Sequence, residues 1–143
     1  MGIEMVKMLE NYFTAWNSHD VEGILSFFTD DCLYEDVALK RIVRGKTELR
    51  ALLESVFADI ACFKMEIKSV FSAGSWGASE WTMSGKFVHS SDPGLTATGK
   101  SFLVRGATIF ELSDGKISRN TDYLDVTAFL QQVETTFDSV VRR

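Results

Sequence analysis

The sequence predicts a single α+β domain over residues 1–143, in which a curved antiparallel sheet wraps against helices that precede it. Two observations carry this prediction. Apolar residues recur at helical spacing through most of the first 60 residues, and they alternate with polar residues between residues 63 and 124. Turn-forming residues divide this second part into hairpins. A chain of this length can bury a proper core without disulfides.

Three helices are predicted before the sheet. The first covers residues 3–17, and residues 17–20 end it and cap the second, which ends near residues 29–31. Gly45 opens a third helix over residues 46–60. Their apolar stripes are Met5, Met8, Leu9, Tyr12, Phe13 and Trp16, then Val21, Ile24, Leu25, Phe27 and Phe28, then Leu49, Leu52, Leu53, Val56 and Phe57.

The remaining elements are strands and a closing helix. The predicted strands cover residues 32–37, 42–43, 63–68, 76–87, 101–112 and 117–124. The last two strands join at residues 113–116, where Asp114 and Gly115 suit a type I′ turn. Residues 126–136 form a short helix, with Asp125 as its N-cap. A curved sheet against helices leaves a conical cavity, and such concave apolar pockets bind small molecules.

Composition excludes several classes of function. The net charge is −5 and the basic residues are scattered, so nucleic acid is not an expected partner. No apolar run approaches the ~20 residues of a membrane span, and no signal-peptide pattern is present, so we expect a cytoplasmic protein. Cys32 and Cys62 are expected to be two buried thiols. His19 and His89 lie in turns without ligand spacing, so neither a metal nor a cofactor is predicted.

Several weak motifs become specific through their order and spacing. They are YFTAWNSHD (12–20), ILSFFTDD (24–31), YED (34–36), WTMSG (81–85), ATG (97–99), RG (105–106), DGKI (114–117) and DYLD (122–125). Together they resemble the superfamily of ketosteroid isomerases and SnoaL-like polyketide cyclases over nearly the whole chain. The resemblance implies a cone-shaped, cystatin-like α+β barrel of the nuclear transport factor 2 type, often a homodimer packed through the outer sheet face. Nuclear transport factor 2 is not an enzyme, so the fold alone does not give the function.

Tyr12 and Asp36 are candidate catalytic residues by this resemblance. In the isomerases a tyrosine on the first helix donates to the developing enolate oxygen, and an aspartate matching Asp36 moves the proton. The isomerases place a second donor at the position of Ala107, and alanine donates nothing. Steroid isomerisation by the usual route is therefore disfavoured. The alternatives are that Asp36 is a solvated strand end and that Tyr12 is a core aromatic.

Pairing across the hairpin predicts the surroundings of Asp122. If the turn occupies residues 114–115, Asp122 lies opposite Ala107 with Arg105 diagonal to it, and Asn120 lies opposite Ile109. The resembling cyclases and epoxide hydrolases also place a working aspartate near the end of this strand. Asp122 is therefore the leading candidate for a general acid or base, with Arg105 as a donor to an oxyanion. The alternative is an ion pair between Asp122 and Arg105 that holds the strands together.

The predicted substrate-binding residues are Trp16, Tyr34, Trp81 and Asn120, although the aromatic residues also suit an ordinary core. We expect a cofactor-free cyclase or isomerase that transfers protons on a small apolar carbonyl compound, polyketide-like or steroid-like. One alternative is a non-catalytic module for small-molecule binding or dimerisation. An epoxide hydrolase is disfavoured, because it needs an Arg-x-Asp pair where this chain offers only Glu80.

Overall fold

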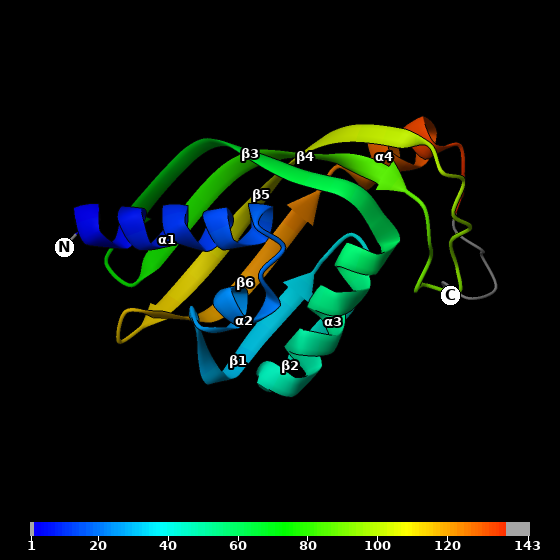
Figure 1. The fold of residues 1–143 in the computed structure, drawn as a ribbon. Helices are drawn as coiled ribbons and strands as arrows, with labels where there is room; N and C mark the ends of the chain where they lie inside the picture. Colours follow the sequence, from blue (N-terminus) through cyan, green and yellow to red (C-terminus); the bar gives the residue numbers. More distant parts are fainter. Residues whose placement is uncertain (1, 137–143) are drawn as a thin grey trace.

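The computed structural model describes residues 2–136, which form four helices and a six-stranded sheet (Figure 1). In chain order the elements are α1 (Gly2–Asn17), α2 (Val21–Leu25), β1 (Phe28–Asp36), β2 (Arg41–Arg44), α3 (Gly45–Asp59), β3 (Ile60–Ala73), β4 (Trp76–Phe87), β5 (Ser101–Ser113), β6 (Lys116–Leu124) and α4 (Val126–Val133). The strands lie in the order β2-β1-β6-β5-β4-β3. Helices α1, α2 and α3 lie against one face of the curved sheet and α4 at one end of it (Figure 1). The predicted α+β class is confirmed.

The strand β1 departs from the predicted arrangement in two respects. It runs parallel to β6, whereas the other neighbouring strands in residues 2–136 are antiparallel. It also begins at Phe28, which the sequence assigned to the second helix. Phe28 pairs with Ile117, and the Ile117 N–H donates to the Phe27 carbonyl at 2.8 Å. The helix α2 ends at Leu25 because the backbone that follows is taken up by the sheet.

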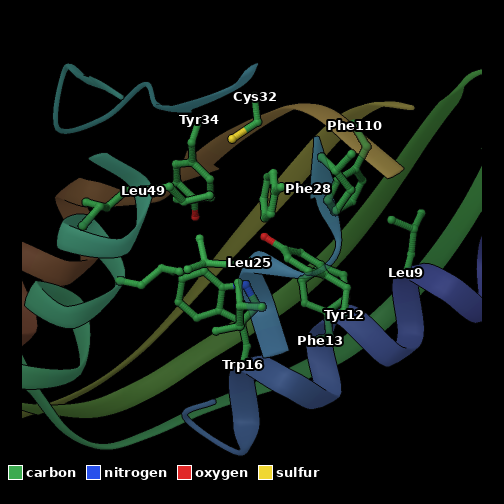
Figure 2. Packing of buried hydrophobic residues seen from close by; sticks show 14 of the residues in the cluster. Leu9, Tyr12, Phe13, Trp16, Leu25, Phe28, Cys32, Tyr34, Leu49 and Phe110 are labelled. Atoms are coloured by element: carbon green, nitrogen blue, oxygen red, sulfur yellow. The ribbon is translucent and has the colours of Figure 1, made fainter. Parts of the chain in front are cut away.

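Two clusters of buried side chains fill the space between the layers. The larger lies between the helices and the concave face of the sheet and is rich in aromatic rings (Figure 2). In it the centroid of the Tyr12 ring lies 5.6 Å from that of Phe28 and 5.7 Å from that of Phe110. The smaller cluster joins α4 to the sheet, and there the rings of Phe129 and Phe102 lie 4.9 Å apart. None of the helices in residues 2–136 has both the length and the apolar character needed to cross a membrane.

The helix α4 continues the sheet where β6 ends. Because β6 stops at Leu124, the first residues of β5 have no strand on that side. The Gln132 side chain accepts a hydrogen bond from the Leu103 N–H at 2.7 Å and donates to the Leu103 carbonyl at 2.9 Å. The Asp125 N–H donates to the Arg105 carbonyl at 3.0 Å. The Leu103 backbone groups and the Arg105 carbonyl of this exposed edge are thereby paired within the protein.

Two local predictions have different outcomes. Asp125 caps α4 by accepting a hydrogen bond from the Ala128 N–H at 3.1 Å, which confirms its predicted role. Cys32 is buried as predicted, but Cys62 is exposed. A bulge interrupts β3 at this point, and Cys62 adopts a φ of 58° in the left-handed region. This local change of direction turns the second thiol away from the core.

The hairpin between β5 and β6 contains an irregularity that the turn does not reveal. Next to the turn, Leu112 pairs with Ile117 as predicted. The following pair is Glu111 with Arg119, so Ser118 is an extra residue in β6 and forms a β-bulge. The Ser118 hydroxyl donates to the Glu111 carbonyl at 3.1 Å, beside the irregularity.

The bulge shifts every pair that follows it by one residue. Asp122 lies opposite Thr108 and not opposite Ala107, so the predicted register is wrong. Side chains alternate between the two faces of a strand. A shift of one residue therefore places each side chain of β5 on the face opposite the one that the unbulged pairing predicted. Thr108 points to the concave side, and Arg105 and Ala107 project from the outer face.

Replacing Gln132 by alanine should lower the free energy of unfolding by about 1 kcal/mol, because the Leu103 backbone groups lose both partners. Urea unfolding followed by circular dichroism measures this. The matched control is Gln131→Ala, since Gln131 is exposed on the same helix. Equal effects of the two substitutions would show that the amide of Gln132 does not hold α4 in place.

Candidate active site

A cavity of about 140 Å³ lies between the concave face of the sheet and the helices. Its wall is mostly apolar or aromatic, with side chains from α1, α3, β3, β4 and α4, among them Trp16, Val56, Phe63, Met83 and Phe129. A group of polar side chains from β1, β5 and β6 interrupts this wall. A concave apolar site with a few convergent polar groups is typical of small-molecule pockets.

Asp122 is the centre of the polar group. Residues Asn120, Asp122 and Leu124 alternate along β6 and line the cavity. The carboxylate accepts three hydrogen bonds, from the Tyr34 hydroxyl to Oδ2, from the Thr108 hydroxyl to Oδ1 at 2.7 Å, and from the Asn120 amide to Oδ1 at 2.9 Å. The donors belong to three neighbouring strands, so the pairing of the sheet assembles the site.

Two further donors stand behind this group. The Trp81 indole N–H donates to the Thr108 hydroxyl oxygen at 2.9 Å. The Tyr12 hydroxyl donates to the Asn120 Oδ1 at 3.0 Å. Figure 2 shows the hydroxyl groups of Tyr12 and Tyr34 directed into the interior between α1 and the sheet. An indole N–H can only donate and an ionised carboxylate can only accept, so the hydrogen bonds through Thr108 run toward the carboxylate.

The surroundings of Asp122 raise its pKa from 3.8 to about 6. Burial is the largest cause, because Asp122 borders the cavity and its charged form loses water. The three hydrogen bonds lower the pKa, and the negative charge of Asp36 raises it. Burial, followed by the charge of Asp122, also raises the pKa of Tyr12 and of Tyr34 well above the usual value. Both tyrosines are therefore O–H donors at neutral pH.

The carboxylate of Asp122 keeps one place for a proton. Each carboxylate oxygen has two lone pairs, and Oδ1 accepts two hydrogen bonds while Oδ2 accepts one. Within residues 2–136 the second lone pair of Oδ2 has no hydrogen-bond partner. A carboxyl with a pKa near 6 can act as a base at neutral pH and, once protonated, as an acid. The site therefore has the chemistry of a proton carrier.

Asp36 and Arg41 bring further charge to the cavity. Asp36 lies beside Asp122 in the parallel pair of strands, and its Oδ1 accepts a hydrogen bond from the Leu39 N–H at 3.1 Å. Arg41 pairs with Asp36 across β1 and β2 and also lines the cavity. The sequence did not single out Arg41, because it belongs to no motif and only the pairing of β2 with β1 turns it inward.

Seven of the eight predicted site residues line the cavity, namely Tyr12, Trp16, Tyr34, Asp36, Trp81, Asn120 and Asp122. Arg105 does not, because the bulge at Ser118 places it on the exposed outer face. From there Arg105 can neither contact an oxyanion in the cavity, as predicted, nor form the alternative ion pair with Asp122. Thr108 occupies the position opposite Asp122, and it was not predicted as a site residue because the bulge at Ser118 was not predicted.

The described residues also bear on the epoxide hydrolase alternative and on metal binding. Glu80 is exposed on the outer face of β4, and the cavity side of this strand carries Trp81 and Met83. This strand therefore offers the cavity no acid of the kind that the epoxide hydrolases need. Residues 2–136 contain no group of three or more His, Cys, Asp or Glu side chains that could hold a metal ion.

Comparisons with known proteins identify a family and agree with the fold. The model of the SnoaL-like domain family matches residues 9–120. Cyclase aurE of Calcarisporium arbuscula is 29% identical over 116 residues, which cover 80% of this chain and 82% of that protein. The structure of a candidate polyketide cyclase from Silicibacter sp. has a TM-score of 0.78 at 25% identity and covers 90% of this chain and 94% of its own. A protein of Catenulispora acidiphila with a ketosteroid isomerase-like fold, solved in complex with trimethylamine, has a TM-score of 0.77 at 19% identity, with coverages of 89% and 92%.

Replacing Asp122 by asparagine should stabilise the fold at about pH 8 by as much as ~3 kcal/mol, because a pKa raised from 3.8 to about 6 makes the buried charge unfavourable. The folded state binds this proton more tightly than the unfolded state. The wild type is therefore stabilised below the unfolded pKa and loses that contribution as the pH rises through 6.

Urea unfolding of both proteins between about pH 4 and about pH 8 measures this difference, which should shrink towards the acidic end. Asp30→Asn removes an equal charge at an exposed position and is the control. A difference between Asp122→Asn and the wild type that does not change with pH would contradict the raised pKa.

Proposed function

Because the chain belongs to the SnoaL-like domain family, we propose that it is a cyclase or isomerase that transfers protons on a small apolar carbonyl compound of the polyketide or steroid type. The observation that carries the proposal is the Asp122 carboxylate, held by three donors in the wall of an apolar cavity. The similarity to cyclase aurE supports cyclisation as the outcome.

The proposed chemistry begins at Oδ2 of Asp122. This oxygen takes a proton from the carbon beside the carbonyl, and the electrons of the broken C–H bond move into the enolate. Tyr34 donates to Oδ2 before the step. Once the carboxyl is neutral, this hydrogen bond weakens and the Tyr34 hydroxyl can turn to the enolate oxygen. In an isomerisation, protonated Asp122 returns its proton to another carbon of the enolate. In a cyclisation, the enolate carbon attacks a second carbonyl of the substrate, the π electrons of that carbonyl move to its oxygen, and Asp122 protonates the resulting alkoxide.

Other residues of the cavity have supporting roles in this proposal. Asp36 lies next to Asp122 in the sheet and is the second carboxyl able to carry a proton along the substrate. Arg41 supplies positive charge at the same wall, where it can hold a polar oxygen of the substrate. Tyr12 acts through Asn120, because its hydroxyl is already donated to that amide.

One observation favours the second candidate, a pocket that binds a small molecule without turnover. The hydroxyl and indole donors around Asp122 are engaged with one another, with the Asn120 amide or with the Asp122 carboxylate. A site built for an oxyanion normally presents donors that are aimed at the substrate. Turnover measurements separate the two candidates.

Replacing Asp122 by asparagine should lower kcat by about 10²–10⁴-fold, which is the usual contribution of a general acid or base. The measurement follows a thermal-shift screen of polyketide, steroid and terpene carbonyl compounds, with turnover of each ligand detected by mass spectrometry. In the wild type kcat/KM should rise with pH through about 6, since the base must be ionised.

The controls for this experiment are Asp36→Asn and the exposed Asp30→Asn. Loss of turnover in Asp36→Asn would place it in the proton path, and Asp30→Asn should behave as the wild type. If turnover survives in both Asp122→Asn and Asp36→Asn, the acid–base roles are wrong. Ligands that bind without being converted by the wild type would establish the second candidate.

We further propose that a second copy of the chain covers the outer face of the sheet. Large apolar side chains on β3, β4, β5 and β6 are between 37% and 58% exposed there, namely Phe71, Trp76, Leu103, Ile109 and Tyr123. A set of this size on one sheet face is typical of an interaction surface. The same face carries Glu80 and Arg105, so two copies can match apolar groups and opposite charges.

Replacing Ile109 by arginine should shift the protein to monomers, because Ile109 lies in a central strand of this face. Sedimentation equilibrium over a range of protein concentrations measures the association. Ile3→Arg is the matched control, since Ile3 is 86% exposed and belongs to α1, which packs on the opposite face of the sheet. A wild type that remains monomeric throughout would refute the homodimer.

A further inference from the structure

Trp81 makes a contact in the cavity wall that packing alone does not require. Its side chain is only 4% exposed, and its indole N–H donates to the Thr108 hydroxyl oxygen at 2.9 Å. Thr108 is itself 2% exposed and donates to Oδ1 of Asp122 at 2.7 Å. A buried chain of donors therefore starts at Trp81 and ends on the carboxylate.

The direction of this chain has a chemical consequence. A hydroxyl whose oxygen accepts a hydrogen bond becomes a better donor, because each bond polarises the next. With the Trp81 N–H on its oxygen, Thr108 is biased to donate to Oδ1, which favours the ionised carboxyl. Together with Asn120, Thr108 fills the lone pairs of Oδ1 and leaves proton transfer to Oδ2.

Resting on the proposed function, we propose that Trp81 is a positioning residue for proton transfer, because it aligns the Thr108 hydroxyl with Asp122. In this proposal Gly106 leaves the space that the indole ring of Trp81 occupies. Gly106 lies opposite Trp81 in the β4–β5 pair. A Cβ atom at Gly106 would lie 2.2 Å from Cη2, 2.4 Å from Cζ3 and 2.8 Å from Cζ2 of the indole. Only a residue without a side chain lets the ring lie there.

Gly106 is not required for its backbone conformation. The glycines with positive φ in residues 2–136 are Gly45, Gly74, Gly99 and Gly115. Gly106 lies inside a regular strand, where alanine is compatible with the backbone. The effect of Gly106→Ala should therefore come from displacement of the indole, and it should follow the effect of changing Trp81 itself.

A purely structural role for Trp81 in the cavity wall predicts a different effect on the titration of Asp122. If the indole only shapes the cavity, its removal changes ligand fit and KM but leaves the titration of Asp122 as it was. If it aligns Thr108, its removal also raises the pKa of Asp122, because the ionised form loses support. The titration of Asp122 separates the two, and it needs no substrate.

The test is a carbon-13 NMR titration of aspartate-labelled protein, with the Asp122 signal assigned by its loss in Asp122→Asn. Trp81→Phe should raise the pKa by about 0.2–0.6, and Gly106→Ala should raise it in the same direction. Thr108→Val should raise it by about 1–2, and Thr108→Ser, which keeps the hydroxyl, should leave it close to the wild-type value.

The matched control is Met83→Leu, which changes the cavity wall two residues along the same strand without removing a polar group. An unchanged Asp122 pKa in Trp81→Phe, with a changed affinity for ligand, would overturn the proposal. If Trp81→Phe does not fold, Gly106→Ala decides, and a pKa equal to that of Met83→Leu overturns it.

Turnover tests the proposed function and the NMR titration tests the role of Trp81, so a failure of one can be distinguished from a failure of the other. A wild type that converts no carbonyl ligand refutes the enzyme, whereas the NMR shifts in the Trp81 and Thr108 variants are still measured on the same protein. Where turnover is found, the pH at which kcat/KM rises should move in Trp81→Phe by the same amount as the NMR titration.

Discussion

The arrangement around the cavity depends on keeping one carboxylate away from bulk water. Removing Asp122 from water disfavours its charge, and three donors recover part of that loss without cancelling it. The balance leaves a pKa of about 6, between that of a solvated aspartate and that of a permanently neutral acid. Each donor comes from a different strand, so the curvature and pairing of the sheet fix the chemistry as well as the shape of the site.

Periodicity predicted most of the fold, because each helix and each strand shows its own spacing in the sequence. It did not predict how β1 joins the sheet, since no turn connects β1 with β6 and their parallel direction depends on contacts distant in sequence. The N-cap of α4 was predictable, because capping is a local interaction. The exposed Cys62 was not, because its orientation follows from a bulge that leaves no sign in the alternation of residues.

The candidate site was predictable where a residue's face follows from its own strand. Asp122 and Asn120 alternate along β6, and Tyr34 and Asp36 alternate along β1, so each pair lines the cavity together. Prediction failed where the position of a residue depended on the pairing between two strands. A single extra residue at Ser118 moved Thr108 into the position expected for Ala107 and carried Arg105 to the opposite face. The register counted from the turn of a hairpin is correct only up to the first bulge.

The helix α4 forms part of the cavity wall through Phe129. An eight-residue helix is too short to be stable alone, so α4 is ordered by Phe129, Val133 and the amide of Gln132. The three hydrogen bonds that Asp122 accepts come from β1, β5 and β6, and none of them comes from this helix. Substitution of Phe129 can therefore enlarge or reduce the room for a ligand while the Asp122 carboxyl keeps its three donors. For the proposed enzyme, the fit of the substrate would then depend on a different element from those that hold the proton carrier.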